Sequence, residues 1–157
     1  MASSAAVPPD CDARIHRVLA YWQSIRPAPD RLPGRQHVEP SDLAELLRWV
    51  WLVDVQREPP RFRYRLIGTG HRQVMGKDFT GRWIDDVFPD FPQMQGYADF
   101  LAVMAGELRH MRRRPEFPVG EKFVAMERLL LPLARDGVTV DMMLGFTLFT
   151  RADGTTV

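Results

Sequence analysis

The stretch Arg61-Phe62-Arg63-Tyr64-Arg65-Leu66 decides the fold, because charged and apolar residues alternate in it without interruption. Successive side chains of a β-strand point to opposite faces, so this period of two predicts a strand with one covered and one solvated face. We expect Phe62, Tyr64 and Leu66 to point inward and the arginines to point outward.

A second strand is expected directly before this one, over residues 49–56, where apolar residues again recur with a period of two. One face of this strand is expected to carry Trp49, Trp51, Val53 and Val55. The segment Glu58-Pro59-Pro60 indicates a turn, because proline cannot donate to a strand's hydrogen-bond ladder. The two runs therefore predict adjacent antiparallel strands.

The remainder of the chain predicts one longer helix and three further strands. The helix is indicated by apolar residues spaced by three and four positions, namely Met94, Tyr97, Leu101, Met104 and Leu108. The strands are expected around residues 110–114, over 123–133 and over 138–150. The last two carry apolar residues on both faces, so we expect the sheet to be covered on both sides.

An amphipathic helix is expected near the N-terminus, from a cap at Asp10 to Arg26. Its apolar face carries Ile15, Leu19, Trp22 and Ile25. This face could lie on the protein's own sheet or against a second copy of the chain, and we expect it to form the dimer or partner interface. A proline-rich connector and a short second helix from residue 40 follow.

Length and charge limit the class of partner. The chain has 157 residues, which suits a single domain, and a formal net charge of +1. Although 19 of its 21 basic residues are arginine, this balance argues against general attraction to nucleic acid or to a membrane surface. The basic run over residues 109–114 lacks interleaved aromatic residues and is interpreted as a charged edge strand.

Cysteine usage and the lack of a targeting pattern predict a cytoplasmic protein. Cys11 is the only cysteine, which excludes an intramolecular disulfide and agrees with a reducing compartment. On the same ground we expect no structural zinc site and no other metal. Neither a secretory signal pattern nor an apolar run of membrane-spanning length is present in the sequence.

Three segments, together with the order of the elements, carry a resemblance to a known family. They are Tyr64-Arg65-Leu66-Ile67-Gly68-Thr69, Gly76-Lys77-Asp78-Phe79-Thr80-Gly81-Arg82 and Glu127-Arg128-Leu129-Leu130-Leu131-Pro132-Leu133. With them the chain resembles the PAS domain family, in particular the short stand-alone bacterial PAS proteins, in which the N-terminal helix carries a pair like Tyr21-Trp22.

The resemblance implies an α+β fold, with a five-stranded antiparallel sheet, helices on one face and an N-terminal helical extension. It divides the chain into that extension, residues 1–47, and a PAS sensory or interaction domain, residues 48–151. It also implies a small cavity for a ligand and a sheet surface used for dimerisation.

The residues expected around such a cavity are aromatic, Met or polar side chains from several elements. They are His71, Phe79, Trp83, Phe100, Met104, Met126, Arg128, Met142 and Phe146. A filled core without a cavity is the alternative, because such residues are common core fillers.

Arg128 is the most informative member of this set, because it shares a strand face with Met126 and Leu130, where an unpaired guanidinium would be costly. It either pairs with a carboxylate or binds the carboxylate or phosphate of a ligand. The candidate carboxylates are those of Glu121, Glu127 and Asp141.

Residues that hold cofactors in other branches of the family have no match here. Flavin-binding photoreceptors of the family carry a reactive cysteine in the helical region, whereas Cys11 lies outside the domain core. Neither His71 nor His110 takes the place of an axial haem ligand. The sequence therefore shows no flavin or haem signature and leaves the cofactor unknown.

We therefore expect a homodimeric PAS-type sensor or interaction domain that binds an unidentified small molecule and signals through dimer or partner contacts. A dimeric scaffold without a ligand is the alternative. An enzyme, such as a small-molecule isomerase, is the third class, but the sequence shows no catalytic motif and no acid–base pair, so we expect no enzymatic activity.

Overall fold

The computed structural model describes residues 7–115 and 123–157 and contains one five-stranded antiparallel sheet. The strands are β1 (Val50–Arg57), β2 (Pro60–Ile67), β3 (Arg109–Arg113), β4 (Phe123–Leu133) and β5 (Met142–Arg151). Their spatial order is β2-β1-β5-β4-β3, so β1, β5 and β4 are central and β2 and β3 are edges. The predicted α+β fold with five antiparallel strands is confirmed.

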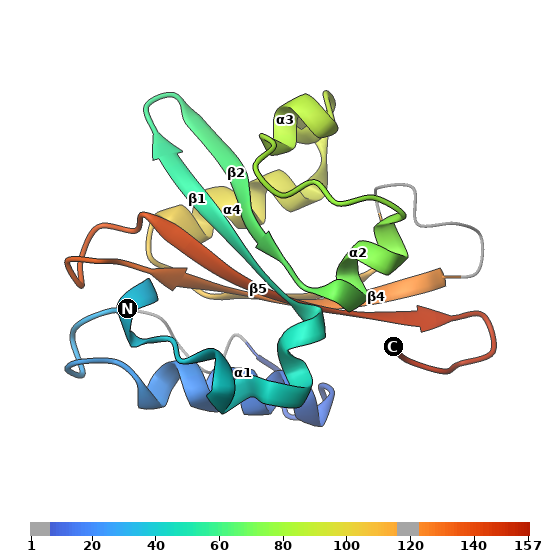
Figure 1. Ribbon diagram of the computed structural model, residues 1–157, viewed down its shortest axis with the longest axis horizontal. Coiled ribbons are helices and arrows are strands. Elements are labelled where there is room, and N and C mark those ends of the chain that lie inside the picture. Colours follow the sequence, from blue (N-terminus) through green and yellow to red (C-terminus); the bar gives the residue numbers. More distant parts are fainter. Residues whose placement is uncertain (1–6, 116–122) are drawn as a thin grey trace.

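Helices cover both faces of the sheet (Figure 1). One face carries α1 (Ala13–Ser24) together with the 3₁₀ helices η2 (Arg35–His37) and η3 (Pro40–Trp49). The other face carries α2 (Thr69–Met75), α3 (Ile84–Val87), the 3₁₀ helix η4 (Phe91–Gln93) and α4 (Gln95–Met104). Among the described residues no helix has the length and apolarity needed to cross a membrane.

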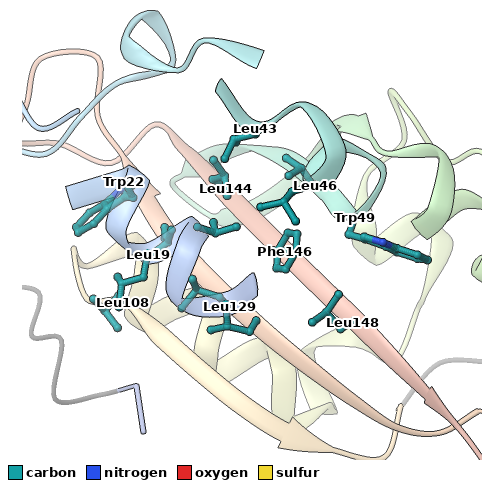
Figure 2. Packing of buried hydrophobic residues seen from close by; sticks show 14 of the residues in the cluster. Leu19, Trp22, Leu43, Leu46, Trp49, Leu108, Leu129, Leu144, Phe146 and Leu148 are labelled. Carbon is teal, nitrogen blue, oxygen red and sulfur yellow. The ribbon is translucent and has the colours of Figure 1, made fainter. Parts of the chain in front are cut away.

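The apolar face of α1 lies on the protein's own sheet, which corrects the prediction that it forms a dimer or partner interface. Ile15 and Trp22 are at most 1% exposed and Leu19 is buried beside them, while Ile25 is partly buried at the edge of the same cluster. The indole Nε1 of Trp22 donates a hydrogen bond of 2.9 Å to the carbonyl of Pro132 on β4. Figure 2 shows α1 residues packed with the apolar side chains of β4 and β5. The helix lies here because the second face of these strands is also apolar and must be removed from water.

The predicted alternation of buried and exposed side chains in β2 fails near the C-terminal end of the strand. Phe62 and Tyr64 are buried as expected, but Leu66 is 41% exposed and Ile67 is buried in its place. The register between β1 and β2 shifts opposite Leu52, where Arg65 is the extra residue. Since an inserted residue moves all following side chains to the other face, the bulge reverses the orientation of Leu66.

The faces of two other elements also differ from the prediction. Trp49 ends η3 and packs on the α1 side of the sheet, apart from Trp51. In α4 the most deeply buried side chains are Phe100 and Val103, whereas Leu108 follows the helix and packs on the α1 side. The three-and-four spacing therefore predicted the helix correctly, but the residues that are buried lie about one position earlier in the sequence than the predicted ones.

The arginines of β3 form ion pairs at the edge of the sheet, as the interpretation of a charged edge strand requires. Arg109 contacts Glu107 at 3.1 Å, Arg112 contacts Glu127 at 2.9 Å, and Arg113 contacts Asp99. Charged side chains on an edge strand oppose pairing with another chain.

Candidate functional site

A cavity of about 50 Å³ lies between the sheet and the helices α2, α3 and α4. The sheet contributes Trp51, Tyr64, Met126, Arg128 and Thr147 to its wall. The helical side contributes His71, Ile84, Phe88, Phe91, Met94, Gly96 and Phe100. The wall is therefore mainly aromatic and apolar, with a few polar groups, and none of its residues is acidic.

His71 reaches the cavity from α2, a helix of only two turns that begins directly after β2. A glycine at position 70 permits the close approach of this helix, because a Cβ there would lie 2.7 Å from the ring of Trp49. The His71 side chain is 3% exposed, and its ring centroid lies 5.9 Å from that of Trp51 and 5.6 Å from that of Phe149.

Burial and the nearby charge of Arg128 lower the pKa of His71 to about 3. The imidazole is therefore neutral at physiological pH and offers the cavity a nitrogen lone pair and an N–H group. Its Nδ1 atom makes no hydrogen bond with the described residues. An imidazole in this state can orient a polar ligand without adding charge.

Arg128 places a guanidinium group against the cavity, and its side chain is 9% exposed. The Nη2 atom lies 3.6 Å from the Asp99 carboxylate of α4, and the guanidinium carbon lies 5.6 Å from the ring centroid of Phe100. A Cβ at Gly96 would lie 3.2 Å from Nη2, so the guanidinium sits against the first turn of α4. Asp99 also forms an ion pair with Arg113, so the Asp99 carboxylate connects Arg128 to the edge strand β3.

The carboxylates that the sequence suggested for Arg128 are not those found beside it. Glu127 points to the opposite face, where its carboxylate accepts hydrogen bonds from His110 and Arg112. Asp141 donates its backbone N–H to Leu133, five residues along β4 from Arg128. Glu121 lies outside the described residues. The pairing partner Asp99 comes from a helix, and strand alternation alone could not have identified it.

Trp51 forms the floor of the cavity on β1 and is fixed by three contacts. Its indole Nε1 donates to the hydroxyl of Thr147 at 2.9 Å, and its ring stacks on Phe100 with a centroid distance of 5.9 Å. On the sheet, Gly145 leaves room for the ring, since a Cβ there would lie 2.1 Å from it. Burial raises the pKa of the neighbouring Tyr64, so that phenol stays protonated.

The structure brings four of the nine expected cavity residues together in the wall, namely His71, Phe100, Met126 and Arg128. Phe79 and Met104 are partly buried against the same core but lie outside the wall. Trp83 also lies outside it, under the guanidinium of Arg61 at 4.3 Å.

Met142 and Phe146 are placed on the opposite face of the sheet, which corrects their assignment to the cavity. Both pack in the core beneath α1 and η3, where Figure 2 shows Phe146 beside Leu46 and Leu148. They alternate with Met143 and Thr147, whose side chains face the cavity side. The sequence showed that β5 had two apolar faces but did not show which face met the helices of the domain.

Several wall residues were not identified from the sequence. Trp51 could have been found, because it shares its predicted strand face with Val53. Thr147 could not have been found, because Phe146 was expected in the cavity and alternation therefore placed Thr147 on the opposite face of β5. Phe88 and Phe91 gave no signal, because they lie between α3 and α4 in a segment without a period.

The volume of the cavity restricts what it can hold. Pockets for drug-sized ligands have volumes of roughly 300–1,000 Å³, whereas this one has about 50 Å³. A flavin or a haem does not fit into the cavity as it stands, and Cys11 packs on the α1 side of the sheet, away from it. A ligand of a few non-hydrogen atoms is the size that matches.

A second, larger depression of about 470 Å³ lies on the surface between η3, the edge strand β2 and α2. Its floor is apolar and includes Leu43, Leu47, Leu66 and Ile67. Arginines at its border are Arg35, Arg48, Arg65 and Arg72, and no acidic residue lines it. We call this depression the arginine groove.

The chain matches one family model and is more distantly similar to solved structures. The family model that describes a PAS domain matches residues 12–148. Among solved structures, a LOV protein of Rhodobacter sphaeroides is similar at 15% identity and a TM-score of 0.49, over 88% of this chain and 68% of that one. A fungal LOV domain photoreceptor is similar at 19% identity and a TM-score of 0.46, over 85% of this chain and 89% of that one. No curated protein matches the chain.

Proposed function

Since the chain belongs to the PAS domain family, we propose that it is a sensor domain that binds a small anionic molecule in the cavity between β4, α2 and α4. The observation that carries the proposal is the buried guanidinium of Arg128, which lines the cavity while the carboxylate of its ion-pair partner Asp99, 3.6 Å from Nη2, lies outside the wall. A carboxylate is the ligand group that best matches a guanidinium, because two parallel N–H donors can bind its two oxygens.

The other wall residues support a short organic acid over an inorganic anion. Phe100, Phe91 and Ile84 offer apolar contacts for a small alkyl group, while the neutral His71 adds a hydrogen-bonding group without a competing charge. The cavity of about 50 Å³ favours a short chain. Larger acids would require α4 to move away from the sheet, which is one way in which binding could alter the surface of the domain.

The experiment is a calorimetric and thermal-shift titration with acetate, propionate, butyrate and hexanoate, with the corresponding primary amides as neutral controls. We expect the shorter acids to raise the melting temperature and the amides to have little effect. A ligand at a concentration of 100 times its Kd stabilises the folded state by about 2.7 kcal/mol, which such a titration resolves.

The matched variants are Arg128→Met, which removes the buried charge, and Arg17→Met, which removes a surface arginine outside both the cavity wall and the arginine groove. We expect Arg128→Met to abolish the response to the acids and Arg17→Met to leave it unchanged. An absence of response to every acid in the wild-type protein, with native mass spectrometry showing only the bare chain, would overturn the proposal in favour of a scaffold without a ligand.

We place the output of the sensor in the arginine groove, which would take an acidic, amphipathic segment of a partner protein. Four arginines around an apolar floor provide positive charge and apolar surface, although Arg72 pairs with Asp78 at 3.1 Å and Arg65 lies 3.9 Å from Asp54. The probe is a synthetic helical peptide with leucine on one face and glutamate on the other. Binding should weaken with salt and be lost in Arg48→Glu, and equal binding of a lysine version of the peptide would contradict this assignment.

Homodimerisation stays a prediction, and it requires a surface other than the buried face of α1. Sedimentation at several protein concentrations tests it directly. Trp22 is not a suitable site for a dimer-breaking substitution, because it is part of the core.

A further inference from the structure

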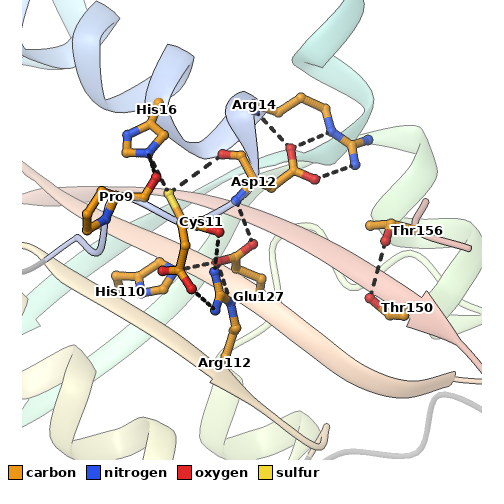
Figure 3. A network of polar contacts seen from close by, with 11 residues as sticks. Pro9, Cys11, Asp12, Arg14, His16, His110, Arg112, Glu127, Thr150 and Thr156 are labelled. Atoms are coloured by element: carbon orange, nitrogen blue, oxygen red, sulfur yellow. Dashed lines mark hydrogen bonds and ion pairs between the residues drawn. The ribbon is translucent and has the colours of Figure 1, made fainter. Parts of the chain in front are cut away.

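A cluster of metal-ligating side chains lies on the face of the sheet opposite the cavity, where the segment before α1 crosses β3 and β4 (Figure 3). It consists of Cys11 from that segment, His110 from β3 and Glu127 from β4. None of the three takes part in the ligand cavity. The side chains of His110 and Glu127 are 6% and 13% exposed, and Cys11 is also buried.

The ligand atoms of these residues are already close together. The Cys11 Sγ atom, a ring nitrogen of His110 and a carboxylate oxygen of Glu127 all lie within 4.8 Å of one another. His110 Nε2 and Glu127 Oε2 are 2.6 Å apart, and His16 Nε2 of α1 lies 3.2 Å from Sγ. Ligand atoms around a tetrahedral zinc ion are about 3.3–3.7 Å apart, given bond lengths of about 2.0–2.3 Å. The cluster could reach this geometry through shifts of about 1 Å.

We infer that Cys11, His110 and Glu127 form a zinc-binding site that fastens the N-terminal segment to β3 and β4. One thiolate, one imidazole and one carboxylate are a donor set that suits Zn²⁺, whereas Mg²⁺ and Ca²⁺ prefer oxygen ligands alone. The fourth position is taken by water or by His16. The sequence predicted no zinc site because the chain has only one cysteine. A mixed donor set from three distant segments needs no more than one.

Arg112 is the group that competes with the metal. Its Nε donates to Glu127 Oε2 at 2.9 Å, and its Nη1 lies 3.6 Å from Asp10. The Arg112 side chain is 47% exposed, so it can turn toward Asp10 and solvent when an ion takes its place on Glu127. Removal of Arg112 should therefore strengthen zinc binding. If the cluster is only an ion-pair network without a metal, the same substitution would remove contacts and produce no zinc binding.

The test uses the full-length protein without an affinity tag, treated with a chelator and then titrated with Zn²⁺ against a chromophoric competitor. We expect one ion per chain and a higher melting temperature with zinc. Co²⁺ should give a thiolate-to-metal charge-transfer band that disappears in Cys11→Ser. Cys11→Ser, His110→Gln and Glu127→Gln each remove a direct ligand and should each weaken zinc binding by at least about tenfold.

The matched controls are His37→Gln and Glu107→Gln, which replace the same residue types outside the cluster. They should leave the affinity unchanged, and Arg112→Gln should raise it. The proposal is overturned if the wild-type protein binds no zinc, or if Co²⁺ binds without the thiolate band. It is also overturned if Arg112→Gln, shown to be folded by circular dichroism, binds no metal.

Discussion

At the scale of single residues, His71 should make the stability of the protein depend on pH. Its pKa in the folded state is lowered to about 3 from a usual value of 6.5. Below pH 6.5 the unfolded chain therefore binds a proton that the folded chain does not, so stability falls as the pH falls through this window. Between pH 7 and pH 5 the contribution lost is about 2 kcal/mol.

Denaturant unfolding of wild type and of His71→Leu at these two pH values measures the contribution. The variant should lose about 2 kcal/mol less than the wild type on acidification, because every other titrating group is shared by the two proteins. Equal losses in the two proteins would mean that the pKa of His71 is not lowered in the folded state, against its burial among Trp51 and Phe149.

The hydrogen bond between Trp51 and Thr147 should be the most sensitive polar contact in the cavity wall. Thr147→Val keeps the shape of the side chain but leaves the indole N–H of Trp51 without its acceptor in a buried position. An unsatisfied buried donor costs about 1–3 kcal/mol. Thr150→Val is the control, because the hydroxyl of Thr150 is exposed near Thr156. It should lower the free energy of unfolding by about 0.5 kcal/mol or less, as is usual for surface substitutions. Similar unfolding free energies for the two variants would contradict this reading.

At the scale of elements, α1 belongs to the core of the protein. Trp22→Ala should lower the unfolding free energy by about 3–5 kcal/mol, because it removes a buried aromatic side chain and its hydrogen bond to Pro132. Gln23→Ala on the exposed side of the same helix should change it by about 0.5 kcal/mol or less. A change in sedimentation behaviour of Trp22→Ala without loss of stability would instead support the interface that the sequence suggested.

The pairing of β1 with β5 depends on a glycine beneath the ring of Trp51. Gly145→Ala would place a Cβ 2.1 Å from that ring, so the strand or the indole must move. Gly76→Ala is the matched control, because its Cβ meets open space and only its positive φ of 78° is unfavourable, at a cost of about 1–2 kcal/mol. Thermal unfolding should show a clearly larger loss for Gly145→Ala, and the reverse order would contradict the close packing described.

Element prediction succeeded where a run of residues has its own period. The hairpin of β1 and β2, the amphipathic α1 and the two long strands β4 and β5 all follow from such runs. It failed at the bulge beside Arg65, because the register of a strand against its neighbour is a property of two segments. The irregular segment from α3 to α4 has no period, and so its contribution to the cavity could not be foreseen.

At the scale of the whole molecule, the sheet is stable only when both faces are covered. Deletion of residues 1–26 would remove α1 and expose apolar side chains of β4, such as Leu129, which is 0% exposed in the whole chain. We expect the shortened protein to associate and to lose its cooperative unfolding transition. Sedimentation and thermal unfolding test this, and a monomer with an unchanged melting temperature would refute it.

By itself the sequence determined the class of fold, the order of the elements and the presence of two apolar faces on β4 and β5. It could do so because strand and helix periods are local, and because Arg128 breaks an otherwise apolar strand face. Only the tertiary structure decided that α1 covers the second face, that Phe146 lies beneath η3 away from the cavity, and that Asp99 stands beside Arg128. It also brought Cys11, His110 and Glu127 together. These outcomes depend on which surfaces meet when the chain folds, and contacts between residues that are distant in the sequence leave no local pattern.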